Sequence, residues 1–368
     1  EIGQTKHMAS QEFLSQLQQL VECQSPTEDL EACIRVMNLA KNIVDANLGG
    51  ASKVFTENGR PALWWGSEKP RVVLLCHLDT VWPHNSYLPL WKIDGDKLFG
   101  PGTFDMKAGF LQAVYSLKEI ANARENIAIV ATSDEEVGSQ TSKALIERIA
   151  NLAEVVLVFE ASLDGKVKTG RKGTSMYQIK VHGRASHAGL DPDKGINATV
   201  EIAQLVLQLK ALENHEHGTS VVPTTLHSGT TTNTVPALAV LDVDSRSFTM
   251  AEMQRVESSI RSLKAHHPDA RIEVTGGINR PPLELSATKD LYEKFEIVAQ
   301  KLGVGPIGHA AVGGASDGNL AAAAGAQVLD GLGGIGDGAH APHEHILISS
   351  IDRQISLTRE FVKELISE

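Results

Sequence analysis

The segment RVVLLCHLDT, residues 71–80, constrains the fold more than any other stretch of the sequence. Val72 to Cys76 are consecutive apolar residues, typical of a short strand buried on both faces. His77 and Asp79 follow directly, where a buried strand avoids polar groups that have no use. Alone, this pair is more typical of a hydrogen-bonded turn than of a ligand site, because short motifs often match by chance. Ligands of open α/β sheets bind at the carboxyl ends of strands, however, so we predict a ligand site here.

Other predicted strands are followed by polar clusters in the same way. They are residues 127–132, followed by SDEEVGS; 155–159, followed by Glu160; and 327–329, followed by DGLGGIGDGAHAPHEH. A further cluster, GPGTFDMKAGF at residues 100–110, leads into a helix predicted to end near Ala123. Strands that alternate with helices indicate an α/β fold with a mostly parallel sheet flanked by helices. Because one edge of such a sheet collects the carboxyl ends, we expect these clusters to lie together.

The rest of the outer segments follows ordinary helix and strand patterns. Helices are predicted over residues 11–23, over a segment that Thr27 with Asp29 can open and that runs to about residue 46, and over 349–366. Strands are predicted over 53–56 and 62–66, and a loop over 82–97. The first residues, EIGQTKHMAS, are polar and without pattern, and they are left out of the fold prediction.

The middle of the chain has a different order of elements. Strands are predicted over residues 175–182, 224–231, 237–247 and 271–275, and helices over 196–213 and 250–265. This βαββαβ order is that of the ferredoxin-like unit. We therefore predict a catalytic domain formed by residues 11–173 and 285–368, with an inserted lid or dimerisation domain at residues 174–284.

Size and composition limit the classes of protein to which the chain can belong. The 368 residues are long enough for two domains with real cores, and the net charge of −11 without a basic block argues against nucleic acid as a partner. No apolar run approaches the length of a membrane span, and no signal-peptide pattern is present. Cys23, Cys33 and Cys76 are scattered, which favours a reducing compartment, so we expect a cytoplasmic protein without a disulfide framework.

The candidate ligands have the chemistry of a site for two divalent ions. They are His77, Asp105, Glu136, Glu160 and His340. Nitrogen and oxygen donors without thiolate suit Zn²⁺ or a similar ion. Such a set can hold two ions about 3.5–4 Å apart with one carboxylate bridging, and a water between them has a lowered pKa. Glu135, beside a ligand and with its own carboxylate able to turn elsewhere, is the predicted general base.

Each ligand also has a purely structural interpretation. Asp105 could cap the helix that begins at Met106, and Glu135–Glu136 could be a solvated pair in a first helical turn. Glu160 could end a strand in water, and His340 could be one of several loop histidines. The coincidence of the whole set at predicted strand ends favours the metal interpretation.

The motifs in their order resemble those of the M20 metallopeptidase family, close to its carboxypeptidase G2-like branch of glutamate carboxypeptidases. They are CHLDTVWP, GPGTFDMKAG, TSDEEVGS, VFEAS, GRASHAG, NTVPALAVLDVDSR and GAHAPHEH, and the similarity covers about residues 10–366. The resemblance implies a di-zinc catalytic domain with an inserted lid or dimerisation domain, which matches the two-part prediction above. Co²⁺ and Mn²⁺ are candidate substitutes for zinc.

The resemblance also implies a role for each site residue. His77 and Glu160 would bind one zinc, Glu136 and His340 the other, with Asp105 bridging. Asp79 would support His77, and Glu135 would be the general base and acid. The Asp105–Met106 peptide bond is expected to be cis.

In the lid, His187 matches a histidine that reaches the partner's active site in dimeric relatives, where it would stabilise the oxyanion. The resemblance therefore implies a homodimer formed through the lid. Asn233, Arg246 and Arg280 match positions that contact the carboxylate end of the substrate, a task that suits the guanidinium fork of arginine.

Two glycine- and histidine-rich segments allow alternatives. AVGGASDG, residues 311–318, resembles a phosphate-binding loop but lacks its lysine, and we predict a glycine-rich turn into a helix beside the site, whose amides could face a substrate carboxylate. His343 and His345 could replace His340 as a ligand, although the family register favours His340. His345 stands where the family pattern commonly has an aromatic residue.

Lys166 and Lys168 are two residues apart on a predicted strand after Glu160, with Arg171 close behind. Lysines often protect a strand edge from pairing, and this is the structural interpretation of the pair. The functional hypothesis is a basic subsite for an acidic side chain, such as a C-terminal glutamate or aspartate.

These residues predict a zinc exopeptidase or N-acyl amino acid amidohydrolase that cleaves an amide next to a free C-terminal carboxylate. The expected mechanism is attack by a zinc-bound hydroxide, with Glu135 relaying the proton to the leaving amine. Alternatives with the same chemistry are a deacylase or desuccinylase of amino acid biosynthesis, or a dipeptidase, although no acidic residue clearly supplies a site for a free α-amino group. A catalytically silent metal- or amino acid-binding protein is disfavoured by the intact Glu135, and a purely structural dimer by the cost of clustered carboxylates.

Overall fold

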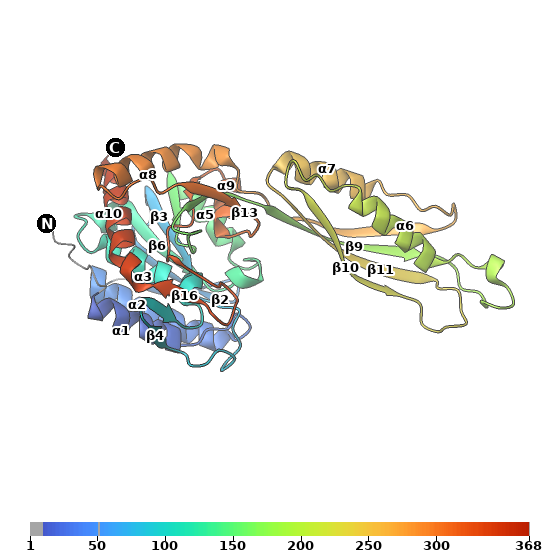
Figure 1. The fold of residues 1–368 in the computed structure, drawn as a ribbon, viewed down its shortest axis with the longest axis horizontal. Coiled ribbons are helices and arrows are strands. Elements are labelled where there is room, and N and C mark those ends of the chain that lie inside the picture. Colours follow the sequence, from blue (N-terminus) through green and yellow to red (C-terminus); the bar gives the residue numbers. More distant parts are fainter. Residues whose placement is uncertain (1–9, 51, 368) are drawn as a thin grey trace. The chain divides into compact units, whose positions relative to one another are not determined.

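The computed structural model describes residues 10–50 and 52–367, which form two compact units. Unit 1 contains the described residues up to Gly170, Leu285–Ala311 and those from Ser316 onward. Unit 2 contains Arg171–Glu284 and Val312–Ala315. Each unit is described separately below (Figure 1).

The centre of unit 1 is a six-stranded sheet. Its order is β1(Lys53–Glu57), β2(Arg60–Gly66), β6(Ile127–Thr132), β3(Val72–His77), β7(Val155–Val158) and β14(Gln327–Leu329). The strands from β6 to β14 are parallel, and β1 and β2 form an antiparallel hairpin beside β6. Every residue of β3 and β6 is buried, as their unbroken apolar runs predict. The α/β fold class predicted from the sequence is confirmed.

The register of the parallel strands aligns their carboxyl ends. His77 at the end of β3 pairs with Thr132 at the end of β6, and Leu75 pairs with Val158 at the end of β7. The polar segments that follow β3, β6 and β7 therefore all leave the sheet at the same edge. This is the geometric condition on which the predicted site depends.

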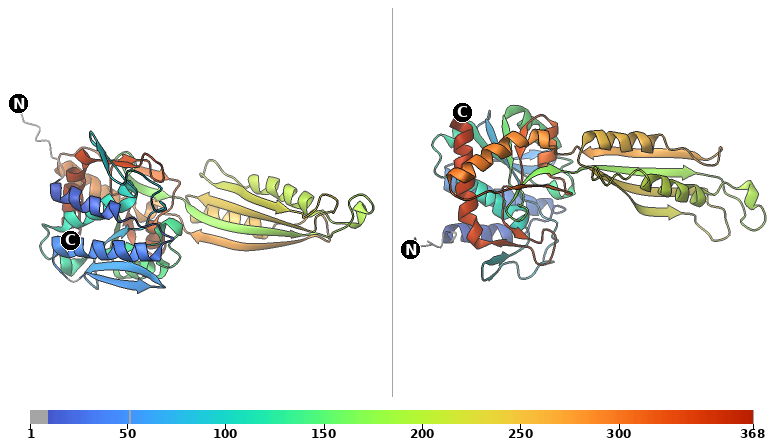
Figure 2. Two further views of the ribbon diagram at one scale, coloured as in Figure 1. Left: turned by 90° about the horizontal axis from the view of Figure 1, so that it is seen from below. Right: turned by 45° about the horizontal axis from the view of Figure 1, so that its top comes forward.

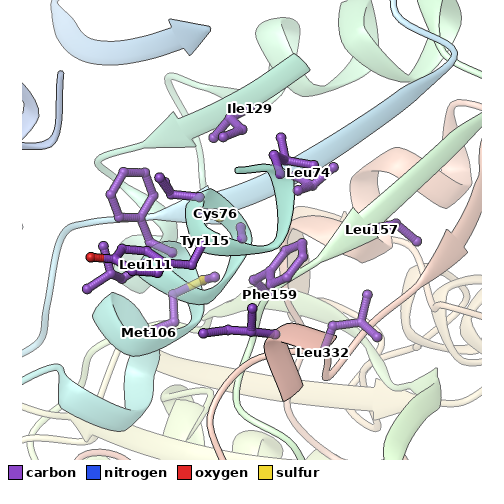
Figure 3. Packing of buried hydrophobic residues seen from close by; sticks show 14 of the residues in the cluster. Leu74, Cys76, Met106, Leu111, Tyr115, Ile129, Leu157, Phe159 and Leu332 are labelled. Carbon is purple, nitrogen blue, oxygen red and sulfur yellow. The ribbon is translucent and has the colours of Figure 1, made fainter. Parts of the chain in front are cut away.

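Helices cover both faces of the sheet. One face packs against α1(Gln11–Glu22), α2(Leu30–Leu48), α3(Ala108–Leu117), α8(Lys289–Lys301) and α10(Ile351–Ser367). Figure 3 shows part of this core, in which residues of three strands meet α3 and the loops around it: Leu74, Cys76, Ile129, Leu157, Met106, Leu111, Tyr115, Phe159 and Leu332. On the face that includes Val158, α9(Asp317–Ala323) packs against β7 and β14, and α5(Lys143–Leu152) packs on α9.

The predicted helix after residue 100 is shorter than expected. It ends at Leu117, and a separate short helix, α4(Ala123–Asn126), precedes β6, with Asn122 between them in a left-handed conformation (φ 57°).

Near the N-terminus, only Ser10 of the patternless segment EIGQTKHMAS lies within the described residues. Its side chain accepts a hydrogen bond from the Phe13 amide (3.1 Å) and caps α1.

A small antiparallel sheet in unit 1 escaped prediction. Its order is β15(Gly336–Asp337), β16(His345–Leu347), β5(Lys97–Phe99) and β4(Lys92–Asp94), and β4 falls in the segment expected to be a loop. Strands of two or three residues are too short to show a period. This sheet joins the segment before residue 100 to the loop that carries His340.

Unit 2 is a four-stranded antiparallel sheet with two helices. The elements follow the order β9(Gly173–His182), α6(Ala198–Lys210), β10(Ser220–Ser228), β11(Leu238–Ser247), α7(Met250–Arg261) and β12(Arg271–Arg280). The spatial order β10-β11-β9-β12 is that of a ferredoxin-like unit. Figure 2 shows α6 and α7 on the same face of this sheet, where they cover residues such as Ile179 and Leu241.

Strands of unit 2 extend beyond their predicted bounds. β10 begins at Ser220 rather than Thr224, and β12 runs to Arg280 rather than Thr275. The Gly276–Gly277 pair suggested an end to β12, yet Gly276 continues the ladder opposite Tyr177 with φ +86°, where a Cβ atom would lie 2.1 Å from the Met176 carbonyl oxygen. Glycine is therefore required there for close approach and not for a turn.

Glycines also fix the end of β7 in unit 1. A Cβ atom added to Gly109 of α3 or to Gly333 would lie 2.1 or 2.2 Å from the carbonyl oxygen of Phe159. No side chain fits in that space, so the two glycines let α3 and the 333 loop enclose the residue that precedes Glu160. The backbone of Glu160 is thereby placed by packing.

We predict that Gly109→Ala destabilises the protein by at least about 2 kcal/mol, because the added methyl group overpacks the contact with Phe159. This predicted change in the free energy of unfolding is opposite in sign to the effect of helix propensity, which favours alanine over glycine by about 1 kcal/mol. Urea unfolding measures the effect. Gly50→Ala, where no atom lies within 4 Å of the added Cβ, is the matched control and should change stability by less than about 0.5 kcal/mol. Equal stability of the two variants would contradict the packing argument.

Candidate metal centre

His77 ends β3 with its ring between two sets of oxygens. Its Nδ1 lies 3.1 Å from the Asp79 carbonyl oxygen and 3.4 Å from Asp79 Oδ1, so Nδ1 carries the proton and donates. Nε2 faces Asp105 Oδ1 at 3.2 Å and Glu160 Oε1 at 3.5 Å. Burial alone would lower the pKa of His77, but the carboxylates of Asp105, Asp79 and Glu160 raise it well above its usual value. This tautomer leaves Nε2 as the atom for a metal.

Asp105 is shared between two histidines. It lies in the turn Thr103–Lys107 before α3, and the Asp105–Met106 peptide bond is cis, as expected. Its Oδ1 faces His77, and its Oδ2 lies 3.4 Å from His340 Nε2. Burial would raise the pKa of Asp105, but His340 and His77 lower it far below its usual value. The N-cap position of α3 is occupied by Lys107, which makes no side-chain cap hydrogen bond, so Asp105 is not the N-cap residue of this helix.

Glu136 and His340 complete a second set on the other side of Asp105. Glu136 lies in the short 3-10 turn Glu135–Val137 after β6, and His340 lies in the loop after β15. His340 Nε2 is 3.0 Å from Glu136 Oε2. Burial raises the pKa of Glu136 to about 7, and the carboxylates of Asp105 and Glu136 raise that of His340 to about 10.

The two sets fit two divalent cations. The ligand atoms of His77, Asp105 and Glu160 lie within 4.8 Å of one another, as do those of Asp105, Glu136 and His340. Three carboxylates and two neutral imidazoles carry a charge that two divalent ions nearly balance. In addition, Glu136 Oε1 is buried and accepts no hydrogen bond from any described residue. A buried carboxylate oxygen without a donor is costly, and a metal ion would satisfy it.

Asp79 supports both the histidine and the acidic turn. It is fully buried, and its oxygens accept hydrogen bonds from the Glu135 amide (3.3 Å) and the Glu136 amide (3.2 Å). The Thr27 hydroxyl donates to Asp79 Oδ2 at 2.9 Å. Thr27 and Asp29 are together predicted to open the second helix; Asp29 caps α2 as predicted, whereas the Thr27 hydroxyl is used by Asp79. No local pattern signals the role of Thr27, because its partner is remote in sequence.

Glu135 lies beside these ligands without being one of them. Its carboxylate belongs to neither ligand set, while its amide is held by Asp79 next to the amide of Glu136. The side chain is half-buried. The role of Glu135 as the general base stays a prediction.

The neighbouring histidines are not alternative ligands in this arrangement. His345 is buried in β16, where its ring lies 5.2 Å from the ring of Phe99 and its Nδ1 faces the His343 carbonyl at 2.8 Å. His343 is exposed and lies 3.9 Å from Asp337 Oδ2. Neither belongs to a described ligand set, whereas His340 does.

In unit 2, the predicted lid residues form two pairs at opposite ends of the sheet. The loop of His187 pairs with that of Asn233, since the Ala188 amide donates to the Asn233 carbonyl at 2.9 Å. At the other end, Arg246 of β11 and Arg280 of β12 both stand opposite Thr174 of β9.

The lysines and the glycine-rich segment lie near β8(Val167–Arg171), which pairs with β13(His309–Val312). Lys166 precedes β8 and is exposed, and Lys168 is half-buried beside Gly331. Arg171 is 3% exposed and donates to the Gly314 and Ala315 carbonyls, so it has a structural role in unit 2. The segment 311–318 leads into α9 through a capping box at Ser316, as predicted for a turn into a helix.

Sequence comparisons show the family to which the chain is related. The sequence profile of peptidase family M20/M25/M40 matches residues 73–364. Carboxypeptidase G2 from Pseudomonas sp. (strain RS-16) is 30% identical over 372 residues, covering 95% of this chain and 88% of that protein. Succinyl-diaminopimelate desuccinylase from Sulfurovum sp. (strain NBC37-1) is 27% identical, covering 81% of this chain and 84% of that protein.

Solved structures share the fold over nearly the whole chain. A tripeptidase from Staphylococcus aureus superposes with a TM-score of 0.78 at 22% identity, covering 98% of this chain and 100% of that chain. An M20 family metallo-carboxypeptidase from Sulfolobus solfataricus superposes with a TM-score of 0.73 at 18% identity, with the same coverage.

The matched family and its curated relative define a hydrolytic metallopeptidase, in the broad sense that includes amidohydrolases, and the two ligand sets are consistent with this class. The chain belongs to peptidase family M20/M25/M40, as its motifs predicted. Among the described residues, no helix combines the length and apolar character needed to cross a membrane. The predicted cytoplasmic location stays a prediction.

We predict that Asp79→Asn weakens metal binding by about 10- to 100-fold, because an amide cannot accept from the Glu135 and Glu136 amides on both oxygens. Competition with a chromophoric chelator measures the affinity. Asp94→Asn, an equal change of charge at an exposed side chain of β4, should leave it unchanged. Wild-type affinity in Asp79→Asn would show that Asp79 does not organise the site.

Proposed function

We propose that the protein is a di-zinc glutamate carboxypeptidase or N-acyl amino acid amidohydrolase of the carboxypeptidase G2 type, which hydrolyses the amide bond next to a free C-terminal carboxylate. The observation that carries the proposal is the position of Asp105, which faces one histidine with each of its oxygens. Similarity to carboxypeptidase G2 over 95% of this chain supports the substrate class.

His77, Glu160 and one oxygen of Asp105 would hold one ion, and Glu136, His340 and the other oxygen of Asp105 the second. When bound, the ions would polarise the amide carbonyl and lower the pKa of a water molecule. Glu135 accepts the proton of the attacking water and delivers it to the leaving amine nitrogen. Asp79 accepts a hydrogen bond from the Glu135 amide and so holds the backbone that carries the base.

His187 would supply the donor for the developing oxyanion. Its Nδ1 accepts hydrogen bonds from the Gly189 amide (3.1 Å) and the Leu190 amide (3.0 Å). The proton of the neutral ring is therefore on Nε2, the exposed side of an exposed residue. Such a donor can stabilise negative charge on a carbonyl oxygen.

The two pairs of unit 2 cannot serve one small substrate from the same subunit. Thr174, opposite Arg246 and Arg280, is eight residues from His182 along β9, which is about 26 Å at 3.3 Å per residue. His187 and Asn233 lie beyond that end. We infer that a homodimer brings the histidine end of one unit 2 to the substrate bound by the other subunit.

The edge of unit 2 supports a dimer. β10 is an edge strand without a charged residue, and it carries the exposed Val222 and Leu226. Val200 and Leu207 of the neighbouring helix α6 are 51% and 72% exposed. An uncharged edge strand beside exposed apolar side chains is a surface that another copy can cover.

A substrate panel tests the function. It contains an N-acyl-glutamate, an N-acyl-alanine, N-succinyl-diaminopimelate and a free dipeptide, each assayed before and after chelation. Chelator-sensitive release of glutamate supports the proposal. Preference for N-succinyl-diaminopimelate would favour the second candidate, a desuccinylase, to which similarity to the Sulfurovum enzyme points. Bound metal without turnover of any member would favour a catalytically silent binder.

Glu135→Gln is expected to lower kcat by at least about 10²–10⁴-fold while both ions stay bound, because the amide cannot accept a proton. Steady-state kinetics and metal analysis of the same sample provide the measurement. Glu125→Gln, at a glutamate in α4 outside the ligand sets, is the control. Substantial activity in Glu135→Gln would remove Glu135 as the base.

Mixed dimers test the trans arrangement. His187→Ala and Glu135→Ala chains should each be inactive alone, and subunit exchange should restore about one quarter of wild-type activity, because half of the dimers are mixed and each has one intact site. An inactive mixture, with exchange verified by mass spectrometry of tagged chains, would show that His187 does not act across the dimer.

The lysine pair is proposed as a basic subsite. Lys166→Ala with Lys168→Ala should lower kcat/KM for an acidic C-terminal residue by about tenfold more than for a neutral one, because the charge pairing is lost. Lys92→Ala at an exposed lysine of β4 is the control. Equal, unchanged values for both substrates would leave the lysines with a surface role only.

A further inference from the structure

Glu344 is a fully buried glutamate outside both ligand sets. Its carboxylate accepts four hydrogen bonds. Oε2 accepts from Trp82 Nε1 (2.8 Å) and the Gly102 amide (3.0 Å), and Oε1 accepts from the Phe104 amide (3.0 Å) and the Asp105 amide (3.1 Å). Burial of a carboxylate is costly unless donors satisfy it, and here each oxygen has two.

The donors belong to the segment that presents the shared ligand. Gly102, Phe104 and Asp105 are part of one turn, and their amides converge on one carboxylate. Gly102 adopts a left-handed conformation (φ +70°), and a Cβ atom there would lie 2.5 Å from Thr80 Cγ2. The turn is thus closely surrounded, and Glu344 fixes the backbone of Asp105 from one side.

Glu344 is also part of the loop that carries His340. Its amide donates to the Ala341 carbonyl at 2.9 Å, and its own carbonyl accepts from the Tyr87 hydroxyl at 2.9 Å. The main chain and the side chain of Glu344 are therefore both held. One residue joins the His340 loop to the Asp105 turn, whose side chains face each other at 3.4 Å.

We propose that Glu344 is a positioning residue for metal binding, which sets the separation of Asp105 and His340 and so the affinity of the ion between Asp105, Glu136 and His340. The inference rests on the proposed two-ion site. It extends that site to a residue that touches neither the substrate nor an ion.

Replacement by glutamine isolates this role because the shape is nearly unchanged. In Glu344→Gln one oxygen becomes an NH₂ group, which would face two N–H donors whichever way the amide is turned. Two hydrogen bonds become donor–donor contacts, and the turn or the side chain has to move. His77 and Glu160 lie on other segments, so the ion that they hold should be affected less.

The test is a Zn²⁺ titration of the metal-free protein against a chromophoric chelator, with the absorption spectrum of the Co²⁺ form as a second readout. Wild type should bind two ions in two steps of the titration. The step that His340→Ala weakens or removes is the one that belongs to the ion held by Asp105, Glu136 and His340, and it is called the His340 step. In Glu344→Gln that step should weaken at least about tenfold more than the other step. Trp82→Phe removes one donor of four and should weaken the same step by about two- to tenfold.

Glu201→Gln is the matched control. Glu201 is a buried glutamate of unit 2 that accepts from the His266 amide (2.7 Å) and the His267 amide (3.1 Å), so its replacement has the same chemistry away from the ligands. Both steps should keep their affinity in this variant.

Equal affinity of wild type and Glu344→Gln at the His340 step would overturn the inference, as would an equal loss at both steps, which indicates general loosening of unit 1. If Glu344→Gln does not fold, Trp82→Phe decides, and an unchanged His340 step overturns the inference. Wild type that binds no ion would instead refute the two-ion site itself, and with it this inference.

Discussion

The structure of unit 1 depends on how it stabilises ionisable groups buried at one edge of a sheet. Asp79 and His77 are 0% and 1% exposed, and Glu160 is 7% exposed. Carboxylates at such depth repel one another unless each oxygen has a donor or a cation. Asp105 meets this condition by facing one imidazole with each oxygen. Glu136 Oε1 is buried without a hydrogen-bond donor among the described residues, and a metal ion would supply the partner that it lacks. The aligned carboxyl ends of β3, β6 and β7 place these groups close together.

Around the ligands, buried carboxylates hold two of the ligand-bearing segments by accepting hydrogen bonds from their backbone N–H groups. Asp79 collects the amides of the Glu135–Val137 turn, and Glu344 collects those of the Asp105 turn. In both cases a buried carboxylate organises backbone that follows or precedes regular structure. This arrangement places the ligands on loops, where a substrate can reach them, while hydrogen bonds to the buried carboxylates keep the loop backbone fixed.

Much of this could be predicted from the sequence, and the exceptions have a common cause. Unbroken apolar runs identified β3, β6 and β7, and the polar residues directly after them identified His77, Glu136 and Glu160. The strands β4, β5, β15 and β16 escaped prediction because they are two or three residues long and form one sheet only through the pairing of β16 with β5, which is remote in the sequence. Thr27 and Glu344 escaped because their partners are tens to hundreds of residues away, and contacts at that separation leave no local pattern.

The most direct test of the account is an anomalous difference map, recorded at the zinc edge, from crystals of the zinc-loaded protein. A two-ion centre predicts two peaks about 3.5–4 Å apart, one on each side of the Asp105 carboxylate, with His77 and Glu160 at one and Glu136 and His340 at the other. A single peak, or peaks that do not contact Asp105, would contradict the two-ion centre on which the proposed function rests.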